Sequence, residues 1–250
     1  MRLARLAFFA LVAAAAAGVP APSRAAGPGV RFHWIAGPQP IDLGHDVLLK
    51  LSDRHSFLGE SEAKELLERL GNFSNGNVIG LVASNDEHAT WFVTIRYDEQ
   101  GYVKDTGRID SDELLSALKG GTEEANKERR ARGFKALHVT GWSEPPQYDR
   151  ALHRLEWALR ASSDDGDSVN FNTRVLGRRG TVSLDLVCDP ADLVADMPEV
   201  ADLLQGTTFK IGARYEDFKA RMDRIAQYGL AGPILAGAGI GAAKGKIALQ

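Results

Sequence analysis

Cysteine is nearly absent from this chain of 250 residues, because Cys188 is the only one. A single cysteine cannot pair within the chain, so no internal disulfide holds this fold together. Cys188 closes an apolar stretch of alternating pattern, and the sequence around it offers no neighbour that would activate a thiol. We therefore expect a small buried side chain there and not a nucleophile.

Catalytic and metal-binding motifs are lacking as well. The sequence contains no Walker loop, no Gly-x-Ser-x-Gly elbow and no His-Glu-x-x-His. Its six histidines are scattered, and none has metal-ligand spacing to another or to the cysteine. Gly237-Ala238-Gly239 is only superficially like a dinucleotide loop, since no strand leads into it. We expect neither a metal nor a cofactor, and the sequence assigns no catalytic residue.

No long hydrophobic run opens the chain. Residues 6–19 are uncharged, but a helix that crosses a bilayer needs roughly 20 apolar residues. Arg2 and Arg5 precede this run, and small residues follow it. That order predicts a secretory signal peptide over residues 1–25, cut after Ser23-Arg24-Ala25. We expect an exported protein, in the periplasm or on the periplasmic side of the membrane.

Positive charge is in deficit once the signal peptide is removed. Cleavage takes away three arginines and no acid, so the formal net charge changes from −3 to −6, with 27 basic against 33 acidic residues. A nucleic-acid partner would require a basic surface, so we expect none.

The exported chain divides into three parts by composition. Residues 26–56 predict an extended lead-in rich in glycine and proline, and residues 57–228 predict a single α+β domain. Residues 229–250 form an apolar tail of small residues, where Gly237, Gly241 and Gly245 are four apart. Such a ridge suits close helix packing in membranes, so this tail is a candidate membrane-associated segment.

The best-patterned region lies in the middle of the chain. Apolar residues alternate with polar ones over 155–159, 169–175 and 182–186, and a glycine-bounded link joins the last two runs. Three such runs predict an antiparallel meander with one apolar face and one solvated face. Helices are expected on both sides of it in sequence, one of them ending at Gly120-Gly121. The fold class is therefore α+β, a layered sandwich of an antiparallel sheet and flanking helices.

Polar side chains on the meander predict a binding face. Asn170, Asn172 and Arg174 share one face of their strand, and Arg154 and Glu156 share one face of the strand before it. If the two faces coincide, guanidinium and amide groups would bind an acidic or sugar-like ligand. The alternative is a solvated face whose ion pairs contribute little.

A loop stiffened by Pro145-Pro146 precedes the meander. Trp142 and Tyr148 of this loop either contact a ligand or fix the loop to the core. Acid–base chemistry would require Asp149, His153 and Glu156 to converge. The candidate ligand-binding residues are thus Trp142, Tyr148, Asp149, His153, Arg154, Glu156, Asn170, Asn172, Arg174 and Arg178.

These segments resemble a known bacterial family. The motifs are Gly-Trp-x-x-x-Pro-x-Tyr-Asp over 141–149, His-Arg-Leu-x-Trp-Ala over 153–158, and Asn-x-Asn-x-Arg-x-Leu-Gly-Arg-x-Gly over 170–180. Their order and spacing resemble the uncharacterised family called domain of unknown function 2167. The resemblance implies an envelope location and an anchor near the C-terminus, but no activity. This chain departs from the family pattern in its weakly hydrophobic C-terminal segment.

Three functional hypotheses follow. The first is a non-enzymatic envelope protein at the membrane surface, whose partner is an unknown envelope ligand or membrane protein bound by the loop and the strand face. The second is a hydrolase or transferase that acts on envelope material. The third is a structural subunit of a membrane assembly that works through the glycine-ridged tail.

Overall fold

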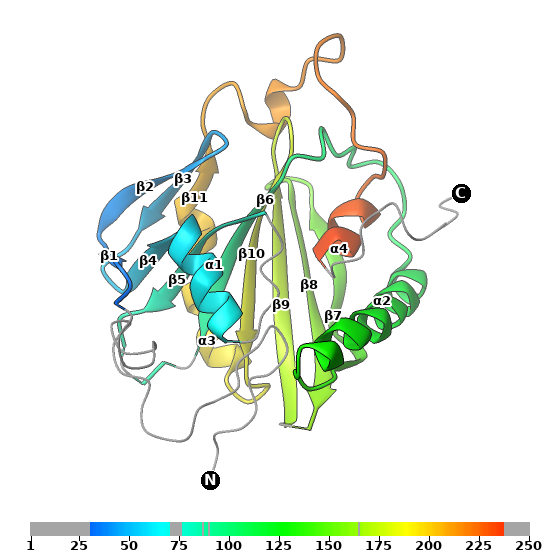
Figure 1. Ribbon diagram of the computed structural model, residues 1–250. Coiled ribbons are helices and arrows are strands. Elements are labelled where there is room, and N and C mark those ends of the chain that lie inside the picture. Colours follow the sequence, from blue (N-terminus) through cyan, green and yellow to red (C-terminus); the bar gives the residue numbers. More distant parts are fainter. Residues whose placement is uncertain (1–30, 71–76, 87, 90, 165, 238–250) are drawn as a thin grey trace.

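The computed structural model describes residues 31–70, 77–86, 88, 89, 91–164 and 166–237, which form an α+β fold (Figure 1). Eight strands form an antiparallel sheet in the order β1-β4-β5-β6-β10-β9-β8-β7. Their bounds are β1 Ile35–Ala36, β4 His55–Gly59, β5 Val78–Ser84, β6 Phe92–Asp98, β7 His138–Asp149, β8 Arg154–Ser163, β9 Gly166–Leu176 and β10 Thr181–Cys188.

A second sheet and four α-helices pack against the large sheet. The small sheet has the order β11-β3-β2, with β2 at Gln39–Gly44, β3 at Val47–Leu51 and β11 at Thr207–Phe209. The helices are α1 Glu60–Arg69, α2 Ser111–Ala131, α3 Leu193–Gly206 and α4 Ala231–Gly237, and the 3-10 helix η2 spans Tyr215–Asp217.

The predicted meander is β8-β9-β10. Its last turn is tight, since the Gly177 N–H donates to the Gly180 carbonyl at 2.8 Å. The other edge of β10 pairs with β6, which places Ser183 opposite Arg96 and Asp185 opposite Thr94. This pairing joins segments about ninety residues apart in the sequence, and no local sequence pattern predicts it.

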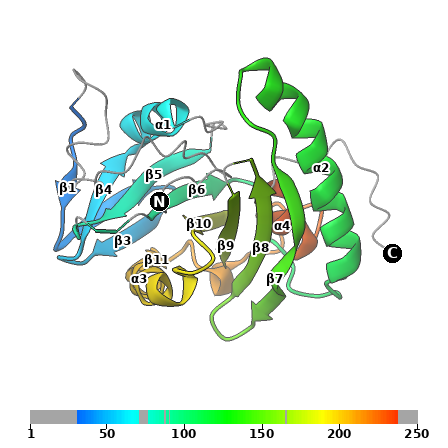
Figure 2. The ribbon, with the colours of Figure 1, turned by 90° about the horizontal axis from the view of Figure 1, so that it is seen from below.

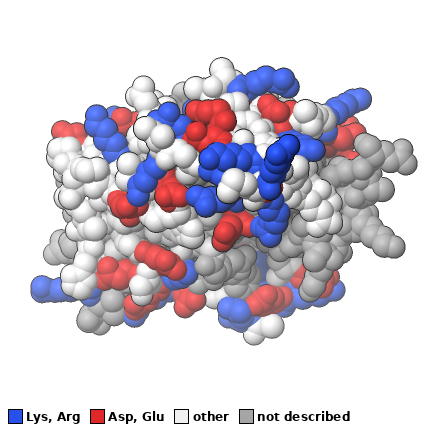
Figure 3. Space-filling view, turned by 90° about the horizontal axis from the view of Figure 1, so that it is seen from above, with Lys and Arg blue, Asp and Glu red and all other residues white. Residues whose placement is uncertain are grey.

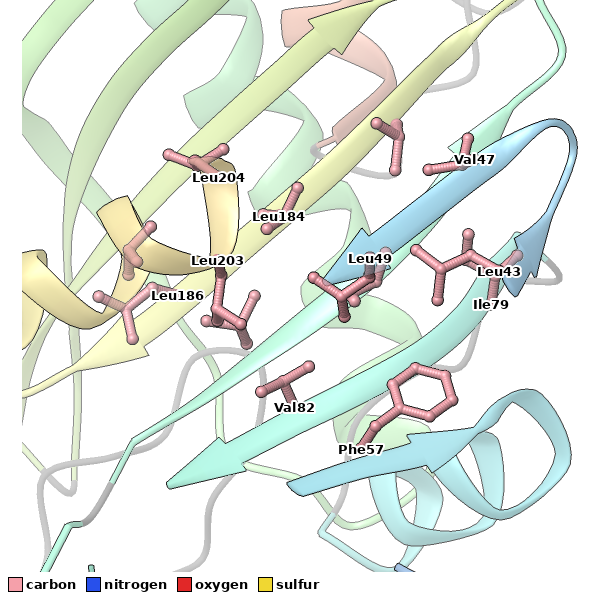
Figure 4. Close-up of a cluster of buried hydrophobic side chains, with 14 of the residues drawn as sticks. Leu43, Val47, Leu49, Phe57, Ile79, Val82, Leu184, Leu186, Leu203 and Leu204 are labelled. Atoms are coloured by element: carbon pink, nitrogen blue, oxygen red, sulfur yellow. The ribbon is translucent and has the colours of Figure 1, made fainter. Parts of the chain in front are cut away.

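One face of the large sheet is covered by the small sheet and α3; we call it the small-sheet face. Figure 4 shows aliphatic side chains from both sheets and α3 meeting there. Leu49 and Leu51 of β3 are at most 1% exposed, and burying a leucine contributes about 1.5–3 kcal/mol. The extended lead-in expected over residues 26–56 is therefore part of the folded domain from Ile35 onward.

The opposite face carries α1 at one side and α2 with α4 at the other; we call it the α1/α2 face (Figure 2). Helix α1 buries Leu66 and Leu67 against β4 and β5. Helices α2 and α4 bury Leu118 and Ile234 against β7 and β8. These two apolar clusters leave the middle of this face, on β6, β10 and β9, to other residues.

Two expected boundaries are wrong. Helix α2 continues through Gly120-Gly121, because Leu114 and Leu118 before the pair and Thr122 and Asn126 after it are buried on one side of the helix. The expected loop at Pro145-Pro146 is part of β7, an edge strand with irregular pairing to β8. Proline is tolerated at a sheet edge because no further strand needs its missing N–H.

The expected apolar tail begins inside the fold. Ala231, Ile234 and Leu235 of α4 are buried against α2 and β8, so the start of the tail belongs to the domain. Gly241 and Gly245 of the expected glycine ridge lie outside the described residues. Among the residues that the structure describes, no helix combines the length and apolar character needed to cross a bilayer.

Candidate functional site

A set of polar side chains occupies the middle of the α1/α2 face. It lies on three adjacent strands, between the apolar cluster under α1 and the one under α2 and α4. We call it the polar strip; its members are Thr94, Arg96, Asn170, Asn172, Arg174, Ser183 and Asp185. Cross-strand pairing sets the positions: Arg96, Ser183 and Arg174 form one row.

Asp185 holds the centre of the polar strip. One carboxylate oxygen accepts from Arg96 and the other from Arg174, each at 2.5 Å. Arg174 is 0% exposed, and its guanidinium lies 4.8 Å from the ring centroid of Trp157. Two guanidinium groups share one carboxylate, so the strip carries a formal charge of +1. That balance favours a ligand with negative charge or oxygen acceptors.

Among the residues that the structure describes, several polar atoms of the strip have no hydrogen-bond partner. The unpaired atoms are Asn170 Nδ2, Arg174 Nε and Ser183 Oγ. All three residues are at most 2% exposed. Buried polar atoms are nearly always paired, so three unpaired ones on one face distinguish the strip from an ordinary core.

The sequence matches a known protein family over most of its length. The family described as "Protein of unknown function (DUF2167)" matches residues 35–250. The chain belongs to this family. The match confirms the resemblance drawn from the motifs on β7, β8 and β9. No match was found among curated proteins.

Two solved structures are similar to this DUF2167 chain at low sequence identity. The cyanobacterial PsbP protein (CyanoP) of Synechocystis sp. PCC 6803 has a TM-score of 0.42 and 6% identity, over 74% of this chain and 96% of that one. The protein of unknown function PA94 of Pseudomonas aeruginosa, titled a putative regulator, has a TM-score of 0.26 and 10% identity, over 67% of this chain and 93% of that one.

Of the residues that the DUF2167 sequence nominated, Asn170, Asn172 and Arg174 come together in the polar strip. The faces do not coincide, so Arg154 and Glu156 are not part of the strip. Those two residues pair with Val175 and Thr173, so they lie on the small-sheet face. Arg154 Nε and Glu156 Oε1 are 2.9 Å apart without the alignment of a hydrogen bond. Burial raises the pKa of Glu156, against the effect of Arg154.

The expected solvated face of the meander is also wrong. Asn170, Arg174, Ser183 and Asp185 are all less than 9% exposed, so the polar face is buried like the apolar one. A single strand cannot reveal this, because alternation reports which residues share a face and not what lies over it.

The residues of the predicted loop have structural contacts. Trp142 donates from Nε1 to the Ser111 carbonyl at 3.1 Å, which fixes β7 to α2. Tyr148 lies 3.2 Å from His153 Nδ1, and burial raises the pKa of its hydroxyl. Asp149 accepts from the Ala151 amide at 2.8 Å and so closes the β7–β8 turn.

No acid–base set forms among the nominated residues. The His153 ring stacks on Tyr215, with 4.1 Å between centroids. Within the described residues, no hydrogen bond or ion pair joins His153 to Asp149 or Glu156. Arg178 lies in the β9–β10 turn, where it holds Asp223 with two bonds of 2.7 and 2.8 Å.

Sequence reasoning missed Arg96, Ser183 and Asp185. Each alternates with apolar residues on its own strand and so resembled an ordinary solvated position. The one local signal was an aspartate in the middle of Val182–Cys188, because a carboxylate within so apolar a strand needs a positive partner.

A separate cleft of about 640 Å³ lies between α3 and the ends of β4, β5 and β6, with Arg54, Trp91, Asp196 and Glu199 in its wall. Glu199 is held by Arg54 and by the buried His55 Nε2, both at 2.9 Å. Burial and then nearby carboxylates raise the pKa of Asp196 to about 6. Among described residues, no group of three or more His, Cys, Asp or Glu is placed to hold a metal ion.

Proposed function

We propose that this protein is an exported, non-enzymatic binding module that takes an oxygen-rich ligand, acidic or sugar-like, on the polar strip. The observation that supports the proposal is the set of three unpaired atoms on Asn170, Arg174 and Ser183. Leaving a buried polar atom unpaired costs about 1–3 kcal/mol. A ligand that completes these hydrogen bonds removes that cost, so binding is favoured.

The chemistry of the unpaired atoms favours oxygen acceptors. Asn170 Nδ2 and Arg174 Nε can only donate, whereas the Ser183 hydroxyl can donate or accept. Carboxylate, carbonyl and hydroxyl oxygens are the matching groups. The second guanidinium, that of Arg96, adds the positive charge that favours an acidic ligand over a neutral one.

Binding without covalent chemistry agrees better with this site than catalysis does. A serine nucleophile needs a base within hydrogen-bond distance, and Ser183 Oγ has no partner among the described residues. The hydrolase or transferase hypothesis relied on Asp149, His153 and Glu156. Each of these three side chains contacts different residues, and none is joined to another of the three among the described residues. Nothing in their geometry favours that hypothesis.

The proposed place of work is the periplasmic side of the membrane, where the partner is an envelope ligand or a membrane protein. The proposal depends on the predicted signal peptide at residues 1–25 and on a membrane role for the tail within 229–250. Because α4 is part of the core, a test should remove only residues 238–250. Loss of the chain from the membrane fraction at unchanged protein level supports the tail, whereas unchanged fractionation contradicts it.

Ligand titration tests the proposed function. The chain without the predicted signal peptide, residues 1–25, is titrated calorimetrically with dicarboxylates, uronic-acid oligosaccharides and neutral oligosaccharides. We expect binding within the oxygen-rich acidic or sugar classes, weakened at least about tenfold by Asn170→Leu, which removes a donor.

Ser56→Ala is the matched control, since Ser56 lies on β4 outside the strip and is buried but paired, donating to Asn85 at 2.6 Å. It should keep the wild-type affinity. Equal affinity of Asn170→Leu and wild type for every ligand that binds would place the ligand elsewhere.

A further inference from the structure

The end of the molecule that carries the β9–β10 turn has an unusual surface. Ile211 is 86% exposed, Met222 77% and Ile225 43%, although apolar side chains of this size are normally buried. They lie in the segment after β11, drawn in orange in Figure 1, which rises beyond the ends of the strands.

This segment is held in place by specific contacts. Arg178 donates to the Gly212 carbonyl at 2.9 Å and to both oxygens of Asp223. Ile211 and Met222, the neighbours of these two residues in the chain, are therefore presented from a common support. Tyr102 bonds to the backbone on both sides of Ile225, at 2.8 and 2.9 Å. The apolar side chains are thus exposed on an ordered backbone.

Basic side chains flank the exposed apolar ones. Lys219, Arg221 and Arg224 are exposed, and among described residues none of the three forms an ion pair. Asp223, which lies between Arg221 and Arg224 in the chain, is already held by Arg178 and by the Lys219 amide. Figure 3 looks onto this end and shows Lys and Arg side chains near its middle, with Asp and Glu side chains beside them.

We infer that this end surface, made of Ile211, Lys219, Arg221, Met222, Arg224 and Ile225, docks onto an anionic phospholipid bilayer. Single apolar side chains on loops can enter the boundary between headgroups and acyl chains, while flanking cations contact the headgroups. A protein partner would be better matched by a continuous apolar patch with charge at its rim. The inference depends on the proposed function only for placing the chain beside a membrane.

Vesicle sedimentation tests the inference. The processed chain is mixed with vesicles of phosphatidylglycerol and phosphatidylcholine, and with vesicles of phosphatidylcholine alone. We expect at least about tenfold tighter binding to the anionic vesicles, weakened by added salt. The triple variant Lys219→Glu/Arg221→Glu/Arg224→Glu should lose at least about tenfold in affinity.

Control variants on other surfaces show whether binding depends on this end surface or only on the net charge of the protein. Lys119→Glu/Lys127→Glu/Arg130→Glu makes the same charge change on exposed positions of α2 and should bind as wild type does. Met222→Asp should weaken binding, whereas Val194→Asp, at a position 84% exposed on α3, should not. Circular dichroism checks that each variant folds.

Three outcomes would overturn the inference. They are equal binding to both vesicle types, wild-type binding by the triple variant and by Met222→Asp, and capture of an acidic protein by this end in place of vesicles. Titration of the same triple variant with the dicarboxylates and oligosaccharides used for the strip distinguishes the two proposals. The triple variant should bind these ligands with wild-type affinity, whether or not it binds vesicles.

Discussion

Asp185 lies between two arginines, with Arg96 on one carboxylate oxygen and Arg174 on the other. It joins β6, β10 and β9 across the α1/α2 face. Removing the charge from such a buried group leaves uncompensated guanidiniums in a low-dielectric environment. The relationship therefore matters for stability as well as for the proposed site.

Asp185→Asn should lower the free energy of unfolding by about 3–5 kcal/mol, measured by urea denaturation. Glu65→Gln is the control, because Glu65 pairs with Arg69 on the exposed side of α1. It should change stability by about 0.5 kcal/mol or less. Equal small losses in both variants would mean that Asp185 is solvated and that the strip is not buried.

Ser183→Ala should leave the stability of the unliganded protein unchanged or raise it. The hydroxyl is 0% exposed and has no partner in the described part of the chain, so its removal ends a desolvation cost without breaking a hydrogen bond. Ser56→Ala should instead cost about 1 kcal/mol, because the Ser56 hydroxyl donates to Asn85. A marked loss of thermal stability in Ser183→Ala would show that its hydroxyl supports the fold.

The meander β8-β9-β10 could be predicted from the sequence. The pairing of β10 with β6 on its other edge could not. Period-2 alternation placed β8, β9 and β10, and Gly177 and Gly180 marked the last turn. The pairing of β10 with β6 depends on core packing over the small-sheet face, which no local pattern encodes. Three of the seven residues of the polar strip could be named, because Asn170, Asn172 and Arg174 share one strand face.

Register was the main reason that Arg154 and Glu156 were wrongly grouped with the residues of the strip. Glu156 lies opposite Thr173, so a shift of one residue would have placed it beside Arg174. Sequence alone gives no such register for a neighbouring strand. The proline pair in β7 and the glycine pair in α2 misled for a related reason, since burial of the surrounding side chains outweighs local propensity.

Asp196 should make stability depend on pH. Its pKa is raised from 3.8 to about 6 in the folded protein, by burial first and by Asp192 and Glu199 next. The unfolded chain therefore loses this proton at lower pH than the folded one, and stability falls as pH rises from about 4 to 6. Above that window both states are ionised, and the contribution is constant.

Asp196→Asn removes this titration. Its unfolding free energy, minus that of wild type, should rise between about pH 4 and 6 and then stay level, measured by urea denaturation at several pH values. A difference that is flat across the window would contradict the raised pKa.

Cys188 should be unreactive in the native protein. It is 1% exposed, and burial raises the pKa of its thiol to about 12, with smaller effects from nearby aspartates. Alkylation by iodoacetamide at about pH 8 should be at least about a hundredfold slower than in concentrated guanidinium chloride, followed by mass spectrometry. Comparable rates in the two states would mean that the thiol is accessible and that the strand end opens readily.

Native mass spectrometry of the protein, purified gently from the envelope of the cells that make it, tests the binding role of the polar strip most directly. We expect a non-covalently bound, oxygen-rich molecule on the wild-type chain and its loss from Asn170→Leu/Ser183→Ala, with Ser56→Ala retaining it. An unliganded wild-type protein that also binds no ligand in titration, or the same bound molecule on the strip variant, would contradict it.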